Sequence, residues 1–314
     1  MTHARIAVIG GTGQVARALA AREAAASGGG GAIIARGRPD VDITDHHSLA
    51  SFLYAVQPAV VVNAAAYTAV DRAESEPEAA FRTNAEGPAR LAVMCAAARA
   101  PLIHVSTDYV FDGTKAVPYA EDDALCPISV YGASKAAGED AVRAGTPHHV
   151  ILRTSWVYDA EGRNFLRTML RLGAERDEVR VVGDQHGAPT SADDLAGAIL
   201  SIAARLAGRE TDGLWGTYHL TAGGETTWHG FAARIFERAA AAGIKTPRLE
   251  AIPTDAYPTA ARRPANSRLD TSKIAGAFGI SLPPWQAGVD RTVARIVDAS
   301  AAEGRVLWPR GDLT

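Results

Sequence analysis

The stretch of this sequence best equipped for chemistry is Tyr131-Gly132-Ala133-Ser134-Lys135. Residues four apart in a helix share one face, so Tyr131 and Lys135 are expected to point the same way. An ammonium beside a phenol favours the ionised form of the phenol, which makes Tyr131 a candidate general acid. The spacing alone is weak evidence, because an ordinary solvated helix start also produces it. The elements that would position this pair must therefore be considered next.

A glycine-rich turn follows the first apolar run, residues 4–9. It reads Gly10-Gly11-Thr12-Gly13-Gln14-Val15-Ala16 and leads into a predicted helix over 14–26. A strand, a glycine turn and a helix form the start of a dinucleotide-binding unit, in which Gly10 allows the tight turn and Gly13 admits a pyrophosphate. The spacing differs from the usual G-x-G-x-x-G, so a tight turn without a ligand is the alternative.

Arg36 stands at the end of the next predicted strand, residues 32–35, with Arg38 close behind. In this fold an acidic residue at that point binds the ribose hydroxyls of NAD, whereas an arginine accepts the 2′-phosphate of NADP. The sequence therefore favours NADPH, with NADH still possible and a solvated arginine as the alternative reading. Asp42 and Ile43 follow as candidate neighbours of the adenine.

Polar and small residues also end the next two predicted strands. Residues 58–62 lead into Asn63-Ala64-Ala65-Ala66, and residues 101–105 lead into Ser106-Thr107-Asp108. Ligands of open α/β sheets bind outside the carboxyl ends of the strands. Successive residues of a strand face opposite ways, so only one of Ser106 and Thr107 is expected to face the site. The residues between these strands, 81–98, have helical periodicity, and Asn84 within them is expected at the surface.

This alternation of strands and helices predicts an α/β fold, a Rossmann-type doubly wound parallel sheet. A length of 314 residues suggests roughly two domains. We predict a dinucleotide-binding domain from residues 1–155 with 190–222, and a smaller α/β sugar-nucleotide-binding domain from residues 156–189 with 223–314. Residues 184–190 are expected to form a loop, and a helix over 227–242 is expected to bury Trp228, Phe231 and Phe236 in a core.

Composition argues against several other classes of protein. The net charge of −3 gives no electrostatic reason to expect a nucleic-acid or membrane partner. No apolar run is long enough to span a membrane, and no secretory signal is evident, so a cytoplasmic location is expected. The histidines and the two cysteines lack the spacing of metal ligands, so no metal site is predicted.

Several further motifs occur together in a fixed order. Besides the glycine turn and the Tyr131–Lys135 stretch, these are Val62–Asp71 with Glu74, Ser106–Phe111, Arg153–Tyr158, Asp184–Thr190 and Arg262–Ser267. Together the motifs resemble those of the dTDP-4-dehydrorhamnose reductases, which are extended short-chain dehydrogenases/reductases. The segments around Trp156 and around Arg262-Arg263-Pro264 are the most specific. The resemblance spans nearly the whole chain.

The resemblance implies a role for each matching residue. Tyr131 would protonate the sugar oxygen, Lys135 would bind the nicotinamide ribose and tune the phenol, and Thr107 would polarise the carbonyl. The implied cofactor contacts are Gly10, Gly13, Gln14, Val15, Arg36, Asp42, Ile43, Ala66, Tyr67, Thr68, Tyr131 and Lys135. The implied substrate contacts are Thr107, Asp108, Trp156, Arg262 and Asn266.

One departure from the family pattern concerns magnesium. Some members bind this ion at a dimer interface through glutamates, and the corresponding positions here are Ala18, Asp193 and Arg295. Two of the three carboxylates are missing, and Arg295 would repel a cation. We therefore do not expect magnesium or that mode of dimerisation, and the sequence leaves a monomer and a homodimer open.

The resemblance implies a reductase that uses NAD(P)H on the C4 ketone of dTDP-4-dehydro-L-rhamnose, for dTDP-rhamnose and surface polysaccharide synthesis. One alternative is a non-catalytic NADP-binding regulatory subunit like that of methionine adenosyltransferase, against which the presence of Thr107, Tyr131 and Lys135 argues. Another is a related sugar-nucleotide epimerase or dehydratase. A dehydratase usually has a glutamate after the aspartate that follows its catalytic hydroxyl, whereas Tyr109 follows Asp108 here.

Overall fold

One six-stranded parallel sheet forms the centre of the computed structural model, which describes residues 5–27, 32–208, 211 and 213–302. Every neighbouring pair of strands in it runs parallel. In spatial order the strands are β10 (Gly216–His219), β5 (His149–Thr154), β4 (Leu102–Thr107), β3 (Val60–Asn63), β1 (Ile6–Ile9) and β2 (Ile33–Arg36). The strand order reverses between β1 and β3, as in a doubly wound Rossmann-type sheet. The predicted fold class is confirmed.

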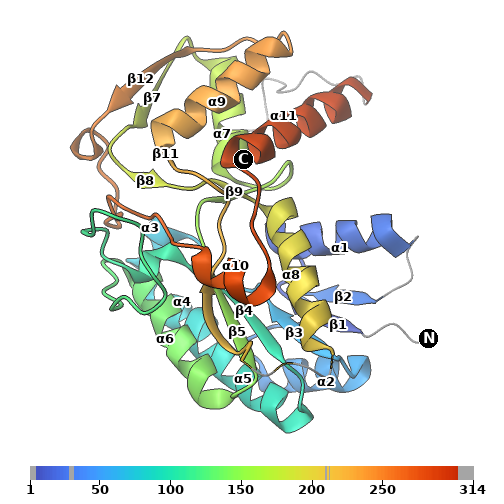
Figure 1. Ribbon diagram of the computed structural model, residues 1–314. Helices are drawn as coiled ribbons and strands as arrows, with labels where there is room; N and C mark the ends of the chain where they lie inside the picture. Colours follow the sequence, from blue (N-terminus) through green and yellow to red (C-terminus); the bar gives the residue numbers. More distant parts are fainter. Residues whose placement is uncertain (1–4, 28–31, 209–210, 212, 303–314) are drawn as a thin grey trace.

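Helices cover both faces of this sheet (Figure 1). Because successive side chains of a strand face opposite ways, Val8 and Val62 pack against one helical layer, and Ala7 and Val61 against the other. The strands are therefore apolar on both faces. The first layer contains α1 (Gln14–Ser27) and α8 (Ala192–Leu206), and the second contains α2 (His46–Val56), α5 (Gly87–Ala98) and α6 (Val130–Gly145).

The predicted helix over 81–98 is not continuous. It comprises α4 (Pro77–Phe81), a π-helical turn η1 (Arg82–Glu86) and α5. Asn84 lies within the π-helical turn and is fully buried, so the prediction that it is a surface residue is wrong. π-helical turns inside helices often occur at functional sites. Two further short elements, α3 (Val70–Ala73) and η2 (Asp108–Val110), follow β3 and β4.

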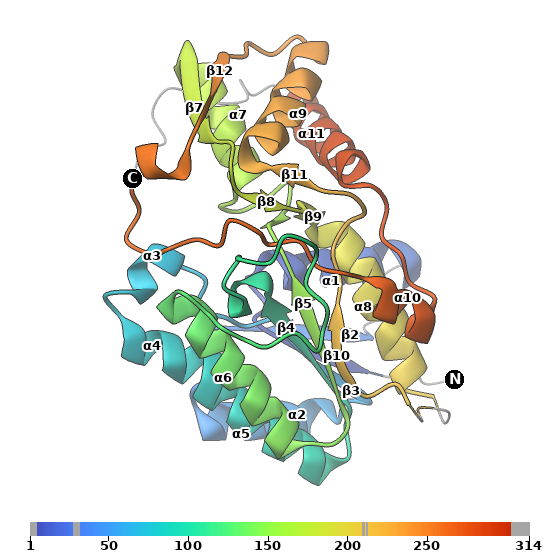
Figure 2. The same cartoon turned by 60° about the vertical axis from the view of Figure 1, so that its left-hand side comes forward.

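A second lobe lies beyond the carboxyl edge of the large sheet (Figure 2). Its core contains Phe231, Phe236 and Trp285, and Trp228 packs against this core. The helix predicted over 227–242 therefore contributes its aromatic residues to a core, as the sequence predicted. Its helices are α7 (Phe165–Glu175), α9 (Trp228–Ala241) and α11 (Trp285–Ala302). Its strands pair as β7 (Glu178–Val182) with β12 (Arg248–Ile252), β8 (His186–Gly187) with β11 (Thr226–Thr227), and β6 (Val157–Tyr158) with β9 (Thr190–Ser191). The predicted loop over 184–190 thus contains two short strands.

The two lobes exchange segments of chain more often than the sequence suggested. α8 and β10 pack with the large sheet, as the range 190–222 predicts. Ile274 and Phe278 of α10 (Ser272–Phe278) also belong to that core, although the predicted range 223–314 places them in the second domain. The 3-10 turn η3 (Thr254–Ala256) follows β12. The predicted ranges also include residues 1–4 and 303–314, which lie outside the described residues.

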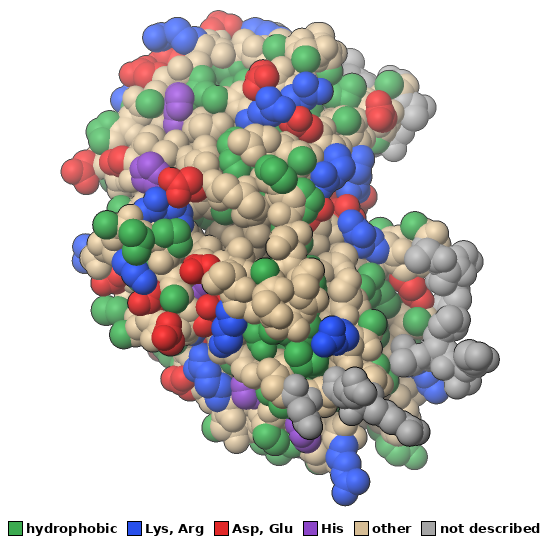
Figure 3. Space-filling view, viewed as in Figure 1, with side chains coloured by type: hydrophobic (Ala, Val, Ile, Leu, Met, Phe, Trp, Pro, Cys, Tyr) green, Lys and Arg blue, Asp and Glu red, His purple; other side chains and the backbone are tan. Residues whose placement is uncertain are grey.

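The described part of the surface carries both signs of charge. On the face shown in Figure 3, acidic and basic side chains are interspersed. Within the residues that the structure describes, no helix combines the length and apolar character needed to cross a membrane.

The close approach of α6 to the π-helical turn requires a glycine. A Cβ built on Gly138 would lie 2.0 Å from the backbone oxygen of Asn84. Gly138→Ala should therefore lower the free energy of unfolding by about 1–3 kcal/mol, as overpacking of a core does. Chemical denaturation of the purified protein would measure this loss.

The matched control is Gly276→Ala in α10, where an added Cβ meets nothing within 4 Å. Alanine in an open helical position should leave stability unchanged or raise it by about 0.5–1 kcal/mol. Equal stability of the two variants would contradict the tight contact at Gly138.

Candidate active site

Two adjoining cavities run along the carboxyl edge of the large sheet. Their volumes are about 140 Å³ and about 520 Å³, and Thr12, Gly13, Ala64 and Ala66 line both. The smaller cavity lies over β1, β2 and β3, and the larger continues past β4 and α6. A long cleft of this kind at the switch point of a doubly wound sheet suits a dinucleotide.

The glycine turn shapes the middle of the cleft. Gly10 has a φ of 102°, and a Cβ there would lie 2.6 Å from the backbone nitrogen of Ala65. Only glycine fits such a position without strain. α1 begins directly afterwards at Gln14, which lines the larger cavity together with Val15. A helix start with free N–H groups at the cleft is what a pyrophosphate requires, so these residues fit NADPH.

The end of β2 closes the adenosine side of the cleft. Gly10 and Gly11 both donate to the backbone oxygen of Arg36 at 2.9 Å. The Arg36 side chain is exposed and donates to the backbone oxygen of Ala35, and it does not line the smaller cavity. Arg38 does line it. The assignment of Arg36 to the 2′-phosphate stays a prediction, and Arg38 becomes a second candidate.

The two predicted adenine neighbours lie at the smaller cavity, and their contact with adenine stays a prediction. Asp42 and Ile43 line the smaller cavity, with Asp42 Oδ1 accepting hydrogen bonds from the backbone nitrogen and the hydroxyl of Thr44, each at 2.9 Å. Thr68 lines the larger cavity. Tyr67 lines neither cavity, and its hydroxyl donates to Glu76 at 2.7 Å.

Asn84 ties the cofactor side of the cleft to the catalytic helix. Its Oδ1 accepts from the backbone nitrogen of Tyr67 at 2.8 Å, and its Nδ2 donates to the hydroxyl of Ser134 at 2.9 Å. Ser134 in turn donates to the backbone oxygen of Tyr131 at 2.7 Å. The sequence gives no signal for this role, because Arg82, Thr83 and Glu86 flank Asn84 and make the stretch look solvent-exposed.

Tyr131, Lys135 and Thr107 meet at the larger cavity, as the sequence predicted. α6 begins at Val130 because Ser129 caps it, accepting from the backbone nitrogen of Gly132 at 3.1 Å. Lys135 is 2% exposed and donates to the backbone oxygen of Val105 at 2.7 Å.

Thr107, the last residue of β4, lines the larger cavity together with Tyr131. Ser106, by contrast, donates to Glu139 at 2.6 Å. Thr107 is therefore the strand-end hydroxyl that is available to the site.

The pKa values of Tyr131 and Lys135 are shifted mainly by burial and not by the attraction between the two side chains. Burial raises the pKa of Tyr131 to about 12, and the charge of Asp108 adds to this rise, while the hydrogen bond with Thr107 opposes it. Burial also lowers the pKa of Lys135 to about 8, against the opposing charge of Glu139. The expected lowering of the Tyr131 pKa by Lys135 is thus outweighed by desolvation. Near neutral pH Tyr131 holds the proton that a general acid must give.

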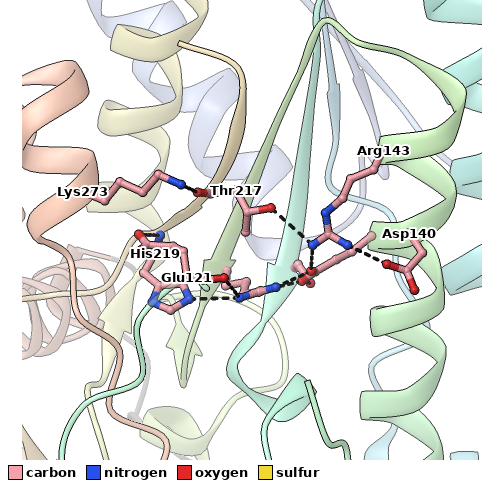
Figure 4. A network of polar contacts seen from close by, with 9 residues as sticks. Glu121, Asp140, Arg143, Thr217, His219 and Lys273 are labelled. Atoms are coloured by element: carbon pink, nitrogen blue, oxygen red, sulfur yellow. Dashed lines mark hydrogen bonds and ion pairs between the residues drawn. The ribbon is translucent and has the colours of Figure 1, made fainter. Parts of the chain in front are cut away.

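A network of polar contacts joins α6 to the strands beside it, and Figure 4 shows its members Asp140, Arg143 and Thr217. Glu139, one helical turn after Lys135 on α6, is fully buried and accepts from Arg153 at 2.9 and 2.7 Å. Arg143 adds a bond to Glu139 at 2.7 Å and reaches Asp140 and Thr217. Although burial raises it, the bonds and charge of Arg153 hold the pKa of Glu139 below its usual range. One carboxylate thus fixes α6 against β5.

Trp156 closes the far side of the larger cavity. Its backbone has a φ of 49°, in the left-handed region, and its ring stacks on Trp228 with centroids 3.7 Å apart. On the other side, a Cβ on Gly187 would lie 2.6 Å from the indole. The ring is therefore held in one place at the rim of the site, where the sequence analysis expected a sugar contact.

A third cavity of about 630 Å³ opens in the second lobe. Arg263 lines it and pairs with Asp71 at 2.7 Å, whereas Arg262 is exposed and does not line it. Asn266 is buried, and its amide donates to two backbone oxygens and accepts from Arg268 at 2.8 Å. Of this segment, Arg263 lines the cavity whereas Arg262 and Asn266 do not, and the predicted substrate contacts of Arg262 and Asn266 stay predictions.

The positions where relatives were expected to bind magnesium carry other contacts. Asp193 accepts two bonds from Arg22, at 2.8 and 2.9 Å. Arg295 lies 3.6 Å from Asp159, and Ala18 is buried. Among the described residues, no group of His, Cys, Asp and Glu is arranged to hold a metal ion.

Residues 4–297 match a family described as the RmlD substrate binding domain. The chain belongs to this family. The resemblance found in its motifs is thereby confirmed.

Relatives of the family show the same likeness over most of the chain. The dTDP-4-dehydrorhamnose reductase of Sinorhizobium fredii is 46% identical over 301 residues, which are 96% of this chain and 99% of that protein. The enzyme of the same name from Escherichia coli is 47% identical over 262 residues, covering 83% and 87%. The crystal structure of the Bacillus anthracis dTDP-4-dehydrorhamnose reductase in complex with NADP has a TM-score of 0.86 at 33% identity, covering 94% and 100%.

The buried ion pair behind Lys135 should matter for stability far more than pairs at the surface. Glu139→Ala leaves Arg153 buried without a counter-charge, a loss of about 3–5 kcal/mol in the free energy of unfolding. Urea denaturation would measure it. The matched control is Glu175→Ala, which breaks the part-exposed pair with Arg171 in α7 and should cost roughly 0.3–0.5 kcal/mol. If both variants lost a similarly small amount of unfolding free energy, the pair of Glu139 with Arg153 would not be important for stability.

Proposed function

We propose that this chain reduces the C4 ketone of dTDP-4-dehydro-L-rhamnose to dTDP-L-rhamnose with NADPH. The observation that carries the proposal is the meeting of Tyr131, Thr107 and Lys135 at the end of a dinucleotide-shaped cleft. Membership of the family supports the choice of substrate, and the NADP in the Bacillus anthracis structure supports the choice of cofactor.

Each of the three residues has a separate task in the proposed reaction. Bound NADPH supplies the hydride. Tyr131 gives its proton to the C4 oxygen as negative charge develops there, and Thr107 donates a hydrogen bond to the same oxygen. Lys135, fixed by the backbone oxygen of Val105, holds the nicotinamide ribose and stabilises the phenolate left behind.

The substrate is proposed to span two cavities. The sugar lies between Tyr131 and Trp156 in the larger cavity, with Asp108 beside it. The nucleotide end reaches the third cavity, where Arg176, Arg180 and Arg263 supply positive charge for phosphate. Aromatic rings for a base are available there too, in Phe165, Trp228 and Tyr257.

Two alternatives fit the geometry less well. A regulatory subunit would have no need of a tyrosine, a lysine and a threonine brought together at the cofactor cleft. A dehydratase would need a further carboxylate beside Asp108. Tyr109 occupies that position instead, and its ring packs edge-on against that of Tyr131 with the ring centroids 5.8 Å apart. We further infer a cytoplasmic location, where nucleotide sugars and NADPH are available, and a monomer or homodimer. The direct assay is NADPH oxidation with dTDP-4-dehydrorhamnose, compared with the UDP-linked sugar.

Replacing the phenol should separate chemistry from binding. Tyr131→Phe keeps the ring and removes the proton donor, so kcat should fall by about 10²–10⁴. The dissociation constant for NADPH, measured by fluorescence, should change little.

Tyr54→Phe serves as the control, because Tyr54 lies on α2 and is 81% exposed. It should keep normal turnover. If Tyr131→Phe also turned over normally, Tyr131 could not be the acid.

The two arginines at the end of β2 can be distinguished by cofactor preference. Arg36→Ala should weaken NADPH binding by roughly tenfold and leave NADH binding unchanged, because it removes a charge partner of the 2′-phosphate. Arg38→Ala is the matched variant. Selective loss of NADPH binding in Arg38→Ala alone would transfer the role to Arg38, and equal losses for both cofactors would contradict a 2′-phosphate contact.

A further inference from the structure

Asp108 is a buried carboxyl group in the active site that the proposed reaction does not need as a proton donor. It is 3% exposed and lines the larger cavity beside Thr107 and Tyr131. Its Oδ1 accepts from the Thr107 hydroxyl at 2.9 Å. Its Oδ2 has no partner with acceptable hydrogen-bond geometry among the described residues, although Ser267 lies near the carboxylate.

The bonds around Thr107 constrain where its proton points. A hydroxyl has one proton to donate, and an ionised carboxylate can only accept. The backbone nitrogen of Tyr109, 3.2 Å from Thr107 Oγ1, can only donate. While Asp108 is ionised, the proton of Thr107 is therefore committed to Asp108. Thr107 then has no proton left to donate to the substrate oxygen or to the oxygen of Tyr131.

Protonation of Asp108 reverses this arrangement. A neutral carboxyl group can itself donate to Thr107 Oγ1, so it no longer needs the proton of the Thr107 hydroxyl. Thr107 is then free to donate to the substrate oxygen or to the phenolate of Tyr131. Neutral Asp108 also removes a negative charge that raises the pKa of Tyr131. Both effects make Tyr131 a better acid.

We propose that Asp108 is a positioning residue whose protonation sets the direction of the Thr107 hydrogen bond and so frees Thr107 to assist proton transfer from Tyr131 to the substrate. The inference rests on the proposed reduction and adds a regulatory group to it. No atom of Asp108 enters the product, because Asp108 takes its own proton from solvent and keeps it through the reaction.

The electrostatic surroundings place this switch in an accessible pH range. Burial raises the pKa of Asp108 to about 6, while the nearby Ser267 hydroxyl and the bond from Thr107 favour the ionised form. The other ionisable groups that face this turn belong to α6, η2, α3 and the segment around residue 263: Tyr131, Lys135, Tyr109, Asp71 and Arg263. Of the tyrosines, Tyr131 has its pKa raised to about 12 and Tyr109 has its pKa raised as well, so neither titrates near pH 6. Lys135, with a pKa of about 8, titrates only above that range.

The test is the pH dependence of kcat for NADPH oxidation, at saturating substrate, from about pH 5 to about pH 7.5. In the unaltered enzyme kcat should fall as the pH rises through the pKa of Asp108, by up to roughly tenfold per pH unit, as for one titrating group. Asp108→Asn keeps the shape and supplies a permanent donor, so its profile should be flat. Thr107→Ser keeps the hydroxyl and should retain the fall.

A second variant keeps the proposal testable if Asp108→Asn does not fold. Ser267→Ala removes a neighbouring hydroxyl that favours ionised Asp108, so the fall in kcat should move to higher pH. A flat profile in the unaltered enzyme would overturn the proposal. So would an unchanged fall in Asp108→Asn, even with a raised KM, or a fall in Ser267→Ala that does not move. Absence of any NADPH oxidation by the unaltered enzyme would instead refute the proposed function.

Discussion

The bond between Glu139 and Arg153 is the interaction on which the rest of the site depends. Two charged side chains, 0% and 1% exposed, meet between α6 and β5 and satisfy each other there. Burying such charges is costly unless they are paired and hydrogen-bonded. The pair therefore tolerates only one placement of α6 along the sheet. That placement in turn fixes Lys135 and Tyr131, which lie one and two turns earlier on the same helix.

Close packing restricts the same helix from the other side. A Cβ on Gly132 would lie 2.1 Å from the backbone oxygen of Tyr109, so the glycine between the two catalytic residues allows α6 to touch the turn after β4. Thr107 and Asp108 belong to that turn. The hydroxyl, the phenol and the carboxyl group are thus positioned by backbone contact, and the local charges then determine which of them holds a proton.

The sequence predicted the parts of this arrangement that depend on local pattern. Apolar runs and glycine spacing were enough for the sheet and for the turn at the cleft, whereas the spacing of Tyr131 and Lys135 became informative only together with the family resemblance. It failed where tertiary contacts override local preference. Asn84 was expected at the surface, yet it is buried. Its hydrogen bonds to Tyr67 and Ser134 offset the cost of removing its amide from water. The pKa of Tyr131 was expected to fall, but the desolvation that raises it depends on elements distant in sequence. Arg262 and Arg263 cannot be distinguished by sequence, and only the path of the loop shows that Arg263 lines the third cavity and Arg262 does not.

The exchange of chain segments between the lobes has a consequence for folding. α8, β10 and α10 complete the core of the large sheet, while α7 before them, α9 between them and α11 after them build the other core. Neither core can form from one uninterrupted stretch of chain. The two halves should therefore lose their structure in a single cooperative step on heating, and neither lobe can be isolated as a fragment by one cut in the chain.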